Sequence, residues 1–330
     1  MTAALAGSFP GAVVADVEIG EVAEGTNRRA RVRLGYRAGI GPESVFVKRE
    51  GRLLNRLALS ALGALDAEAR LFASGVTLPL ESPTPYAAAV DRRRLATVVV
   101  MEDVTLRLAR PNVATIPLTM RQVTDGLGGL ARLHSAFWGR PLPTSLRFLR
   151  PWKLGARWAP VSWASLAWAL HRLRLGGHGG AIPIDADATT LERRFRASAA
   201  KAASGPQTVL HGDPHPGNTY ALPGEATGFY DWQLVRTGNW AHDVGYFLVS
   251  GLDVADRRAH ERHLLGAYLE ELGKGGVVPP GFAEAWHLYR QTPAFGLSTW
   301  LHTFSGRGFQ SVEVCLAMIE RFTAAYVDHG

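Results

Sequence analysis

The sequence predicts an α+β protein of two lobes, in which a small antiparallel sheet with one helix precedes a larger, mainly helical lobe. Three observations support this prediction. The chain has 330 residues, enough for about two domains of ordinary size. Strand-like segments are concentrated before residue 104, and apolar residues at helical spacing dominate after it. We therefore expect a first lobe at residues 1–103 and a second at residues 104–330.

The first lobe contains three segments with the apolar, β-branched pattern of strands: Arg31–Tyr36, Ser44–Lys48 and Leu95–Met101. We expect them to pair in one antiparallel sheet. Between the second and third, leucines recur at helical spacing from Leu53 to Ala73, just before Gly75 and a proline-rich turn. This pattern predicts one helix that interrupts the sheet.

The second lobe begins with a strong helical pattern from Thr119 to Trp138, where apolar residues form one stripe. His134 lies on that stripe, and we expect it to be a buried core residue. The stretch from Arg140 to Gln207 is rich in tryptophan and has the character of an insertion between core elements.

Composition excludes several classes of protein. The net charge of +7 suits an anionic ligand such as a nucleotide, but the basic residues are scattered and not interleaved with stacking aromatics, so we expect no nucleic-acid partner. Cys315 is the single cysteine, which excludes an internal disulfide and favours the reducing cytoplasm. We expect no secretion signal, no membrane-spanning segment and no membrane partner, because no long apolar run is present.

The segment that carries chemistry is VLHGDPHPGNTY, residues 209–220, followed by GFYDWQ, residues 228–233. Both are typical of short strands that lead into loops. Phosphoryl transfer needs a carboxylate that deprotonates the attacking hydroxyl, and oxygen ligands that hold Mg²⁺ on the phosphates. Asp213, Asn218 and Asp231 supply these groups, and Asp213 and Asn218 have the spacing of the protein-kinase catalytic loop.

These residues resemble the aminoglycoside phosphotransferase and choline kinase family, especially its ecdysteroid-kinase-like branch. The family motif HGDxHxGN and a later metal-binding Asp appear here as HGDPHPGN and YDWQ. The resemblance implies a protein-kinase-like bilobal fold, ATP and Mg²⁺ as cofactors, and transfer of the γ-phosphate to a hydroxyl of a small molecule. It also implies that Asp213 is the base, that Asn218 and Asp231 hold Mg²⁺, and that His211 organises the loop.

The resemblance covers most of the chain. LARLHSAFW at residues 130–138 resembles the family helix before the insertion, and NWAHDVGYFL at 239–248 resembles the helix after the catalytic loop. VVVMEDV at 98–104 resembles the hinge between the lobes, which places Met101 and Glu102 at the nucleotide. Asp243 begins an apolar helical run, where a carboxylate caps free N–H groups, and we expect structural support from it.

Lys48 ends a strand of the first lobe, where a kinase-like fold places the lysine that contacts nucleotide phosphates. The alternative is an ordinary solvated lysine. Its expected partner is Glu68, on the helix of that lobe, although Glu50 is also close in sequence. Both Lys48 and Glu68 are therefore candidate nucleotide-site residues.

A phosphate-covering loop should precede Lys48, and Gly25, Thr26 and Asn27 are the candidates. They lack a full G-x-G-x-x-G pattern, and a simple hairpin turn is the alternative.

Two other functions remain open from the sequence. One is a catalytically silent nucleotide-binding protein, which the presence of Asp213, Asn218 and Asp231 disfavours. The other is a protein kinase, which would have an activation segment; here an apolar helical run follows Asp231 within about ten residues.

The acceptor is expected to be a neutral or largely apolar alcohol, not a polycationic aminoglycoside. A site for several ammonium groups needs clustered carboxylates. Residues 147–175 and 291–312 contain no Asp or Glu and are rich in aromatic residues. The alternative is that these aromatic residues only pack the helical lobe.

Overall fold

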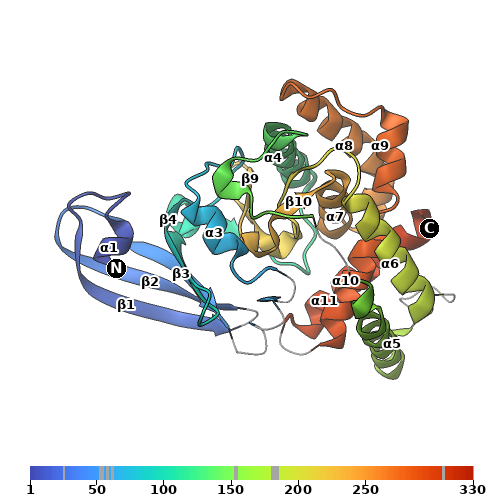
Figure 1. The fold of residues 1–330 in the computed structure, drawn as a ribbon, viewed down its shortest axis with the longest axis horizontal. Coiled ribbons are helices and arrows are strands. Elements are labelled where there is room, and N and C mark those ends of the chain that lie inside the picture. The colour runs from blue at the N-terminus through green and yellow to red at the C-terminus, as the bar shows by residue number, and fades with distance from the viewer. Residues whose placement is uncertain are drawn as a thin grey trace.

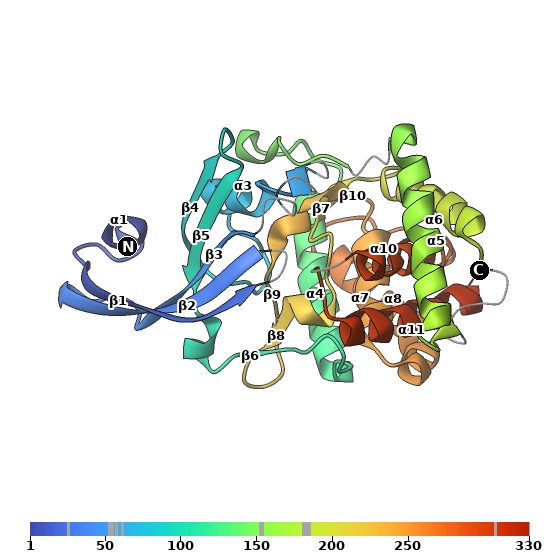
Figure 2. The ribbon, with the colours of Figure 1, turned by 90° about the horizontal axis from the view of Figure 1, so that it is seen from below.

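The computed structural model describes residues 1–24, 27–51, 56, 59–60, 63–151, 155–179, 186–306 and 309–329. It has the predicted α+β arrangement, with an antiparallel sheet at one end of the molecule and a mainly helical part at the other (Figures 1 and 2). No helix in these ranges is both long enough and apolar enough to cross a membrane.

The sheet has five antiparallel strands in the order β1-β2-β3-β5-β4. The three segments predicted as strands are confirmed as members of this sheet. Alternation of β-branched residues turns Val32, Val45 and Val100 to one face, where they pack with Leu5. The strands are β1 (Val13–Glu24), β2 (Asn27–Ala38), β3 (Ser44–Glu50), β4 (Pro85–Asp91) and β5 (Ala96–Glu102), and α1 (Thr2–Leu5) precedes them.

The helix expected from Leu53 to Ala73 is wrong in its extent. Residues 56, 59 and 60 are helical, but the described residues 63–66 are not, and a separate helix α3 (Ala67–Ala73) follows. Gly63 has a φ of 68°, a left-handed conformation that glycine adopts at no steric cost and that ends a helix. Residues 52–55, 57–58 and 61–62 lie outside the described residues. Helix α3 packs against β4 and β5.

The helix expected from Thr119 to Trp138 is confirmed as α4 (Met120–Phe137). Thr119 and Gln122 form a reciprocal capping box at its start, which satisfies backbone N–H groups that helix geometry leaves free. His134 is fully buried, as expected for a core residue.

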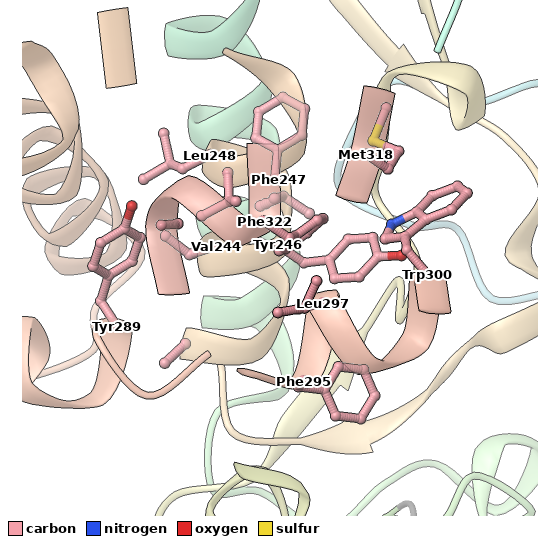
Figure 3. Close-up of a cluster of buried hydrophobic side chains, with 14 of the residues drawn as sticks. Val244, Tyr246, Phe247, Leu248, Tyr289, Phe295, Leu297, Trp300, Met318 and Phe322 are labelled. Atoms are coloured by element: carbon pink, nitrogen blue, oxygen red, sulfur yellow. The ribbon is translucent and has the colours of Figure 1, made fainter. Parts of the chain in front are cut away.

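The helical part packs around one large core. Its centre is α7, in which every residue is buried, and Figure 3 shows Phe247 and Leu248 of α7 among side chains of α10 and α11. The other helices are α5 (Ala159–Leu175), α6 (Ala188–Ala202), α7 (Ala241–Gly251), α8 (Val254–Lys274), α9 (Phe282–Tyr289), α10 (Pro293–Ser305) and α11 (Val312–His329).

Five short strands hold the motif segments against this core. Strand β7 (Thr208–Leu210) pairs with β10 (Arg236–Gly238), and β8 (Thr219–Ala221) lies between β6 (Arg110–Pro111) and β9 (Thr227–Phe229). The loop with Asp213 therefore runs from β7 to β8, and Asp231 follows β9. Pairing of β8 with β9 brings the two motif segments together.

Candidate active site

Asp213 and Asn218 are joined directly within the loop between β7 and β8. Asn218 lies in a 3-10 turn, and its Nδ2 donates to the backbone oxygen of Asp213 at 2.9 Å and to Asp213 Oδ2 at 3.1 Å. Pro216 starts that turn with a fixed φ, which shapes the loop before any ligand is bound. Asn218, five positions after Asp213, thus holds the carboxylate in one orientation.

The loop also depends on Gly212. Its φ is 87°, and a Cβ at this position would lie 2.1 Å from the backbone oxygen of Leu234. Any other residue would be strained by the backbone and would collide with Leu234, so the close approach requires glycine here.

Asp243 fixes the base of the same loop. Its Oδ2 accepts from the backbone N–H of His211 at 2.6 Å, and its Oδ1 accepts from that of Gly212 at 2.9 Å. His134 Nε2 lies 3.3 Å from Oδ2. Burial alone would raise the pKa of Asp243, but these partners hold it below its usual value. Asp243 therefore has the expected structural role, but the N–H groups that it satisfies belong to the catalytic loop.

His211 links this loop to the segment that contains Asp231. Its Nδ1 accepts from the backbone N–H of Asp213 at 3.3 Å, and its Nε2 lies 3.0 Å from the backbone oxygen of Tyr230. With Nδ1 as an acceptor, the ring proton belongs on Nε2, where it can be donated to Tyr230. Burial lowers the pKa of His211, which favours this neutral form.

Lys48, Glu68 and Asp231 form one buried charge cluster. Lys48 Nζ lies 2.6 Å from Glu68 Oε2 and 2.5 Å from Asp231 Oδ1. Glu68 Oε1 also accepts from the backbone N–H of Trp232 at 3.0 Å. Lys48 is therefore not a solvated lysine, and Glu68 is the partner that the sequence predicted.

The two carboxylates keep Lys48 charged although it is buried. Burial alone would lower its pKa, but the charges of Asp231 and Glu68 raise it above the ordinary value. Burial alone would raise the pKa of Asp231. The positive charge of Lys48 outweighs burial, so the pKa of Asp231 lies below its ordinary value. Asp231 is therefore an ionised carboxylate at neutral pH.

Asp213 has the opposite electrostatic behaviour. Burial raises its pKa, the negative charge of Asp231 raises it further, and the resulting value is about 7. Hydrogen bonds from Tyr246 and Asn218 limit this increase because they favour the charged form. A carboxylate with a pKa near 7 can accept a proton at neutral pH and release it again.

Three further residues lie near Asp213, and of these only Trp300 belongs to a segment that the sequence predicts to line the acceptor site. His215 Nε2 lies 3.8 Å from Asp213 Oδ2, and burial lowers the pKa of His215 to about 4. The Tyr246 hydroxyl, from α7, lies close enough to Asp213 to lower the pKa of its carboxylate. Figure 3 shows the Trp300 nitrogen pointing toward that hydroxyl, and the Trp300 ring packs edge-on against His215. The second His of the motif was a signal for His215, and Trp300 lies in the aromatic, acid-free segment 291–312. No sequence pattern pointed to Tyr246.

The structure describes only part of the candidate phosphate loop. Gly25 and Thr26 lie outside the described residues. Asn27 is buried at the start of β2, and its Nδ2 donates to Gln233 Oε1 at 2.9 Å. The end of this loop is thus tied to the residue two positions after Asp231.

The hinge residues Met101 and Glu102 do not join the charge cluster through their side chains. Met101 packs against Val99 of the sheet and Ala69 of α3. Glu102 Oε1 accepts from Arg107 Nε at 2.6 Å, and Glu102 Oε2 accepts from the backbone N–H of Thr84 at 3.1 Å. Their contact with a nucleotide stays a prediction.

The chemistry of Asn218 and Asp231 fits a hard cation such as Mg²⁺. Both amide hydrogens of Asn218 are used by Asp213, and no donor among the described residues is bonded to its amide oxygen. Asp231 presents an ionised carboxylate that is partly open to solvent. No group of three His, Cys, Asp or Glu side chains in the described part of the chain could hold a metal alone. Nucleotide phosphates and water would have to complete the shell.

Comparison with known proteins identifies the family. A sequence model of the phosphotransferase enzyme family, APH, matches residues 22–284. This chain belongs to that family. The APH match includes Lys48, Glu68, Asp213, Asn218 and Asp231. No match was found among curated proteins.

Solved structures of APH-like phosphotransferases share the fold. Spectinomycin phosphotransferase APH(9)-Ia, in complex with ADP and spectinomycin, has a TM-score of 0.53 and 14% identity, covering 95% of this chain and 93% of its own. Choline kinase LicA from Streptococcus pneumoniae has a TM-score of 0.51 and 12% identity, covering 96% and 94%. Macrolide 2'-phosphotransferase MphH from Brachybacterium faecium has a TM-score of 0.50 and 16% identity, covering 98% of both chains. At these identities the likeness shows the fold alone.

Proposed function

We propose that this phosphotransferase moves the γ-phosphate of ATP to a hydroxyl of a small molecule, with Asp213 as the base. The observation that carries the proposal is the environment of Asp213: a half-buried carboxylate, oriented by Asn218, with a pKa of about 7. Asp213 would accept the proton of the acceptor hydroxyl as its oxygen bonds to the γ-phosphorus and the bond to ADP breaks.

The remaining polar residues would bind and orient the nucleotide. Asn218 and Asp231 would hold Mg²⁺, which neutralises phosphate charge when bound. Lys48 would contact the phosphates, with Glu68 keeping its ammonium in place, and His211 would keep the loop in register with Tyr230. Asn27, next to the candidate phosphate loop, would anchor that loop through Gln233.

We also propose that the acceptor is neutral or largely apolar. Residues 291–312 contain no Asp or Glu, and they include α10, which delivers Trp300 to the side of His215. Phe295, Leu297 and Leu301 of the same helix are buried in the core, so for them the packing interpretation is correct. Trp300 is only 3% exposed and belongs to the same core, so the support rests on the missing carboxylates of this segment. The ecdysteroid-kinase-like branch stays a prediction consistent with such an acceptor.

The test is ATP turnover in the presence of alcohols and amino sugars, with the phosphorylated product identified by mass. Kanamycin-like aminoglycosides and hydroxylated steroid- or terpenoid-like alcohols are compared side by side, and Asp213→Asn is the matched inactive control. Phosphorylation of the apolar alcohols is the expected result. Efficient phosphorylation of the aminoglycosides alone contradicts the acceptor proposal. Nucleotide binding without turnover on any acceptor would favour the silent nucleotide-binding alternative.

A further inference from the structure

Helix α5 (Ala159–Leu175) lies on the outside of the helical part, at the end of the molecule away from β1 (Figure 2). One face of α5 packs against α6 and α10. The residues of that face are Leu166, Ala169, Leu170 and Leu173, and all four are buried. This contact accounts for the apolar residues on this face of α5, because an amphipathic helix buries one apolar stripe against its neighbours.

The opposite face of α5 is apolar as well. Val161, Trp168 and Leu175 are 59%, 52% and 73% exposed, and they follow one another at a spacing of seven residues. Ala164 and His171 fill the intervening turns and are also exposed, so the five residues have the i, i+3, i+7 spacing of one helix face. We call Val161, Ala164, Trp168, His171 and Leu175 the outer face of α5. Trp158, just before the helix, is 45% exposed.

The chain segment that contains α5 carries positive charge only, although Glu192 of the neighbouring helix α6 accepts a hydrogen bond from Ser162 of α5. From residue 126 to residue 184 the sequence contains no Asp or Glu, although the whole chain has 29 of them. The same stretch has eight basic residues: Arg132, Arg140, Arg147, Arg150, Lys153, Arg157, Arg172 and Arg174. Arg157 and Arg174, at the two ends of α5, are exposed and make no ion pair among the described residues.

Charge decides between the possible occupants of this face. Two copies of the chain would bring Arg157 and Arg174 against the same residues of the partner, and like charges oppose that contact. An anionic bilayer surface instead supplies phosphate groups for the arginines and an apolar boundary for the outer face. Tryptophan favours this boundary because its ring has an apolar body and a polar N–H.

We propose that the outer face of α5 is a peripheral docking surface for anionic lipid bilayers. Helix α5 would lie flat in the headgroup region, with Val161, Trp168 and Leu175 inserted and Arg157 and Arg174 at the lipid phosphates. The proposal departs from the expectation of no membrane partner, but only for contact at the bilayer surface. It does not involve a membrane-spanning segment. The proposal does not depend on the proposed chemistry.

The test is co-sedimentation of the full chain with extruded vesicles. One set contains phosphatidylglycerol and phosphatidylcholine in equal parts, and the other contains phosphatidylcholine alone. The face variant combines Val161→Ser, Trp168→Ser and Leu175→Ser, and its matched control replaces exposed apolar residues of the sheet lobe, Ile19→Ser with Ile40→Ser. The charge variant combines Arg157→Gln and Arg174→Gln, and its control is Arg37→Gln with Arg93→Gln. Thermal unfolding checks that each variant is folded.

We expect the unaltered chain to bind the phosphatidylglycerol vesicles at least about tenfold more strongly than phosphatidylcholine vesicles, because an anionic surface attracts each basic residue near it. The face and charge variants should each lose most of this binding, while both controls and Asp213→Asn keep it. Absence of binding by the unaltered chain, or equal loss in the controls, overturns the proposal. A dimer that the face variant dissociates, or binding to poly-L-glutamate without binding to vesicles, would assign the face to a protein partner and also overturn it.

Discussion

Lys48 Nζ lies 2.5 Å from Asp231 Oδ1, so a lysine of the sheet is ion-paired with the carboxylate that follows β9. The two residues are 183 positions apart in the chain. Because Lys48 also contacts Glu68, one ammonium connects the sheet, α3 and the loop after β9. The charge of Asp231 also acts on the neighbouring Asp213, whose pKa it raises.

Replacing Asp213 with Asn should lower the turnover rate by roughly 10²–10⁴-fold, because the amide cannot accept the hydroxyl proton. ATP binding in the presence of Mg²⁺ should persist, since Asn218 and Asp231 remain. Steady-state kinetics and nucleotide titration measure the two effects separately. A near-normal rate with any true acceptor would refute the assignment of Asp213 as the base.

The pH dependence should report the raised pKa of Asp213. A base must be deprotonated to act, and its pKa of about 7 means that protonated enzyme accumulates as the pH falls through that value. We expect kcat/KM to fall by about tenfold per pH unit below pH 7 and to level off above it. A profile that stays flat down to the ordinary range of aspartate, about pH 4, would contradict the buried environment.

Replacing Asp231 with Ala should abolish Mg²⁺-dependent nucleotide binding, because a carboxylate ligand supplies much of the charge that balances the metal. The same change removes one partner of Lys48, while Glu68 still pairs with it, so the fold should persist. Titration with ATP, with and without Mg²⁺, measures the effect, and circular dichroism checks folding. An unchanged Mg²⁺-dependent affinity counts against Asp231 as a metal ligand.

Replacing Lys48 with Met should lower the rate by about 10²–10³-fold if the ammonium contacts the phosphates in the reaction. Met retains most of the length of the side chain, so the loss reports the charge. Lys201→Met is the control, because Lys201 is an exposed lysine at the end of α6 and should leave the rate unchanged. Wild-type activity in Lys48→Met would limit Lys48 to a structural ion pair.

Replacing Tyr246 with Phe should move the acidic limb of the pH profile to higher pH. The Tyr246 hydroxyl lowers the pKa of Asp213, so its removal lets burial and Asp231 raise that pKa further. Tyr268→Phe is the matched control: it removes another buried hydroxyl, one that contacts His134 Nδ1 at 2.8 Å and does not contact Asp213. If both variants lose stability equally and the pH profile stays in place, Tyr246 acts only in packing.

The chemistry of the loop could be found from the sequence because it is local. Asp213 and Asn218 are separated by four residues, and the prolines and glycines between them restrict the loop to few shapes. The strands around residues 31–36, 44–48 and 95–101 were also predictable, since alternation along a strand is a short-range pattern. Lys48 and Glu68 were found through resemblance to a family in which the same pair occurs.

Other features depended on contacts between distant segments. The sequence placed Asp243 at a helix start, but only the packing of α7 under the loop turned its carboxylate toward His211 and Gly212. The expected helix is interrupted at residues 63–66, where the backbone of Gly63 is in the left-handed conformation. The spacing of the leucines gave no sign of this interruption. Local patterns carry no information about which distant backbone groups need a partner.

The tryptophan-rich insertion shows the same limit. The sequence predicted an insertion without acidic residues from 147 to 175, but it did not predict helix α5. Apolar residues occur on both faces of α5, so periodicity could not select the buried one. Tertiary packing on α6 and α10 buried Leu166 and Leu170 and left Val161 and Trp168 exposed. The sequence by itself determined the reactive groups and the elements that carry them. Only the tertiary structure decided which faces are buried, because burial depends on the neighbours that long-range folding brings into contact.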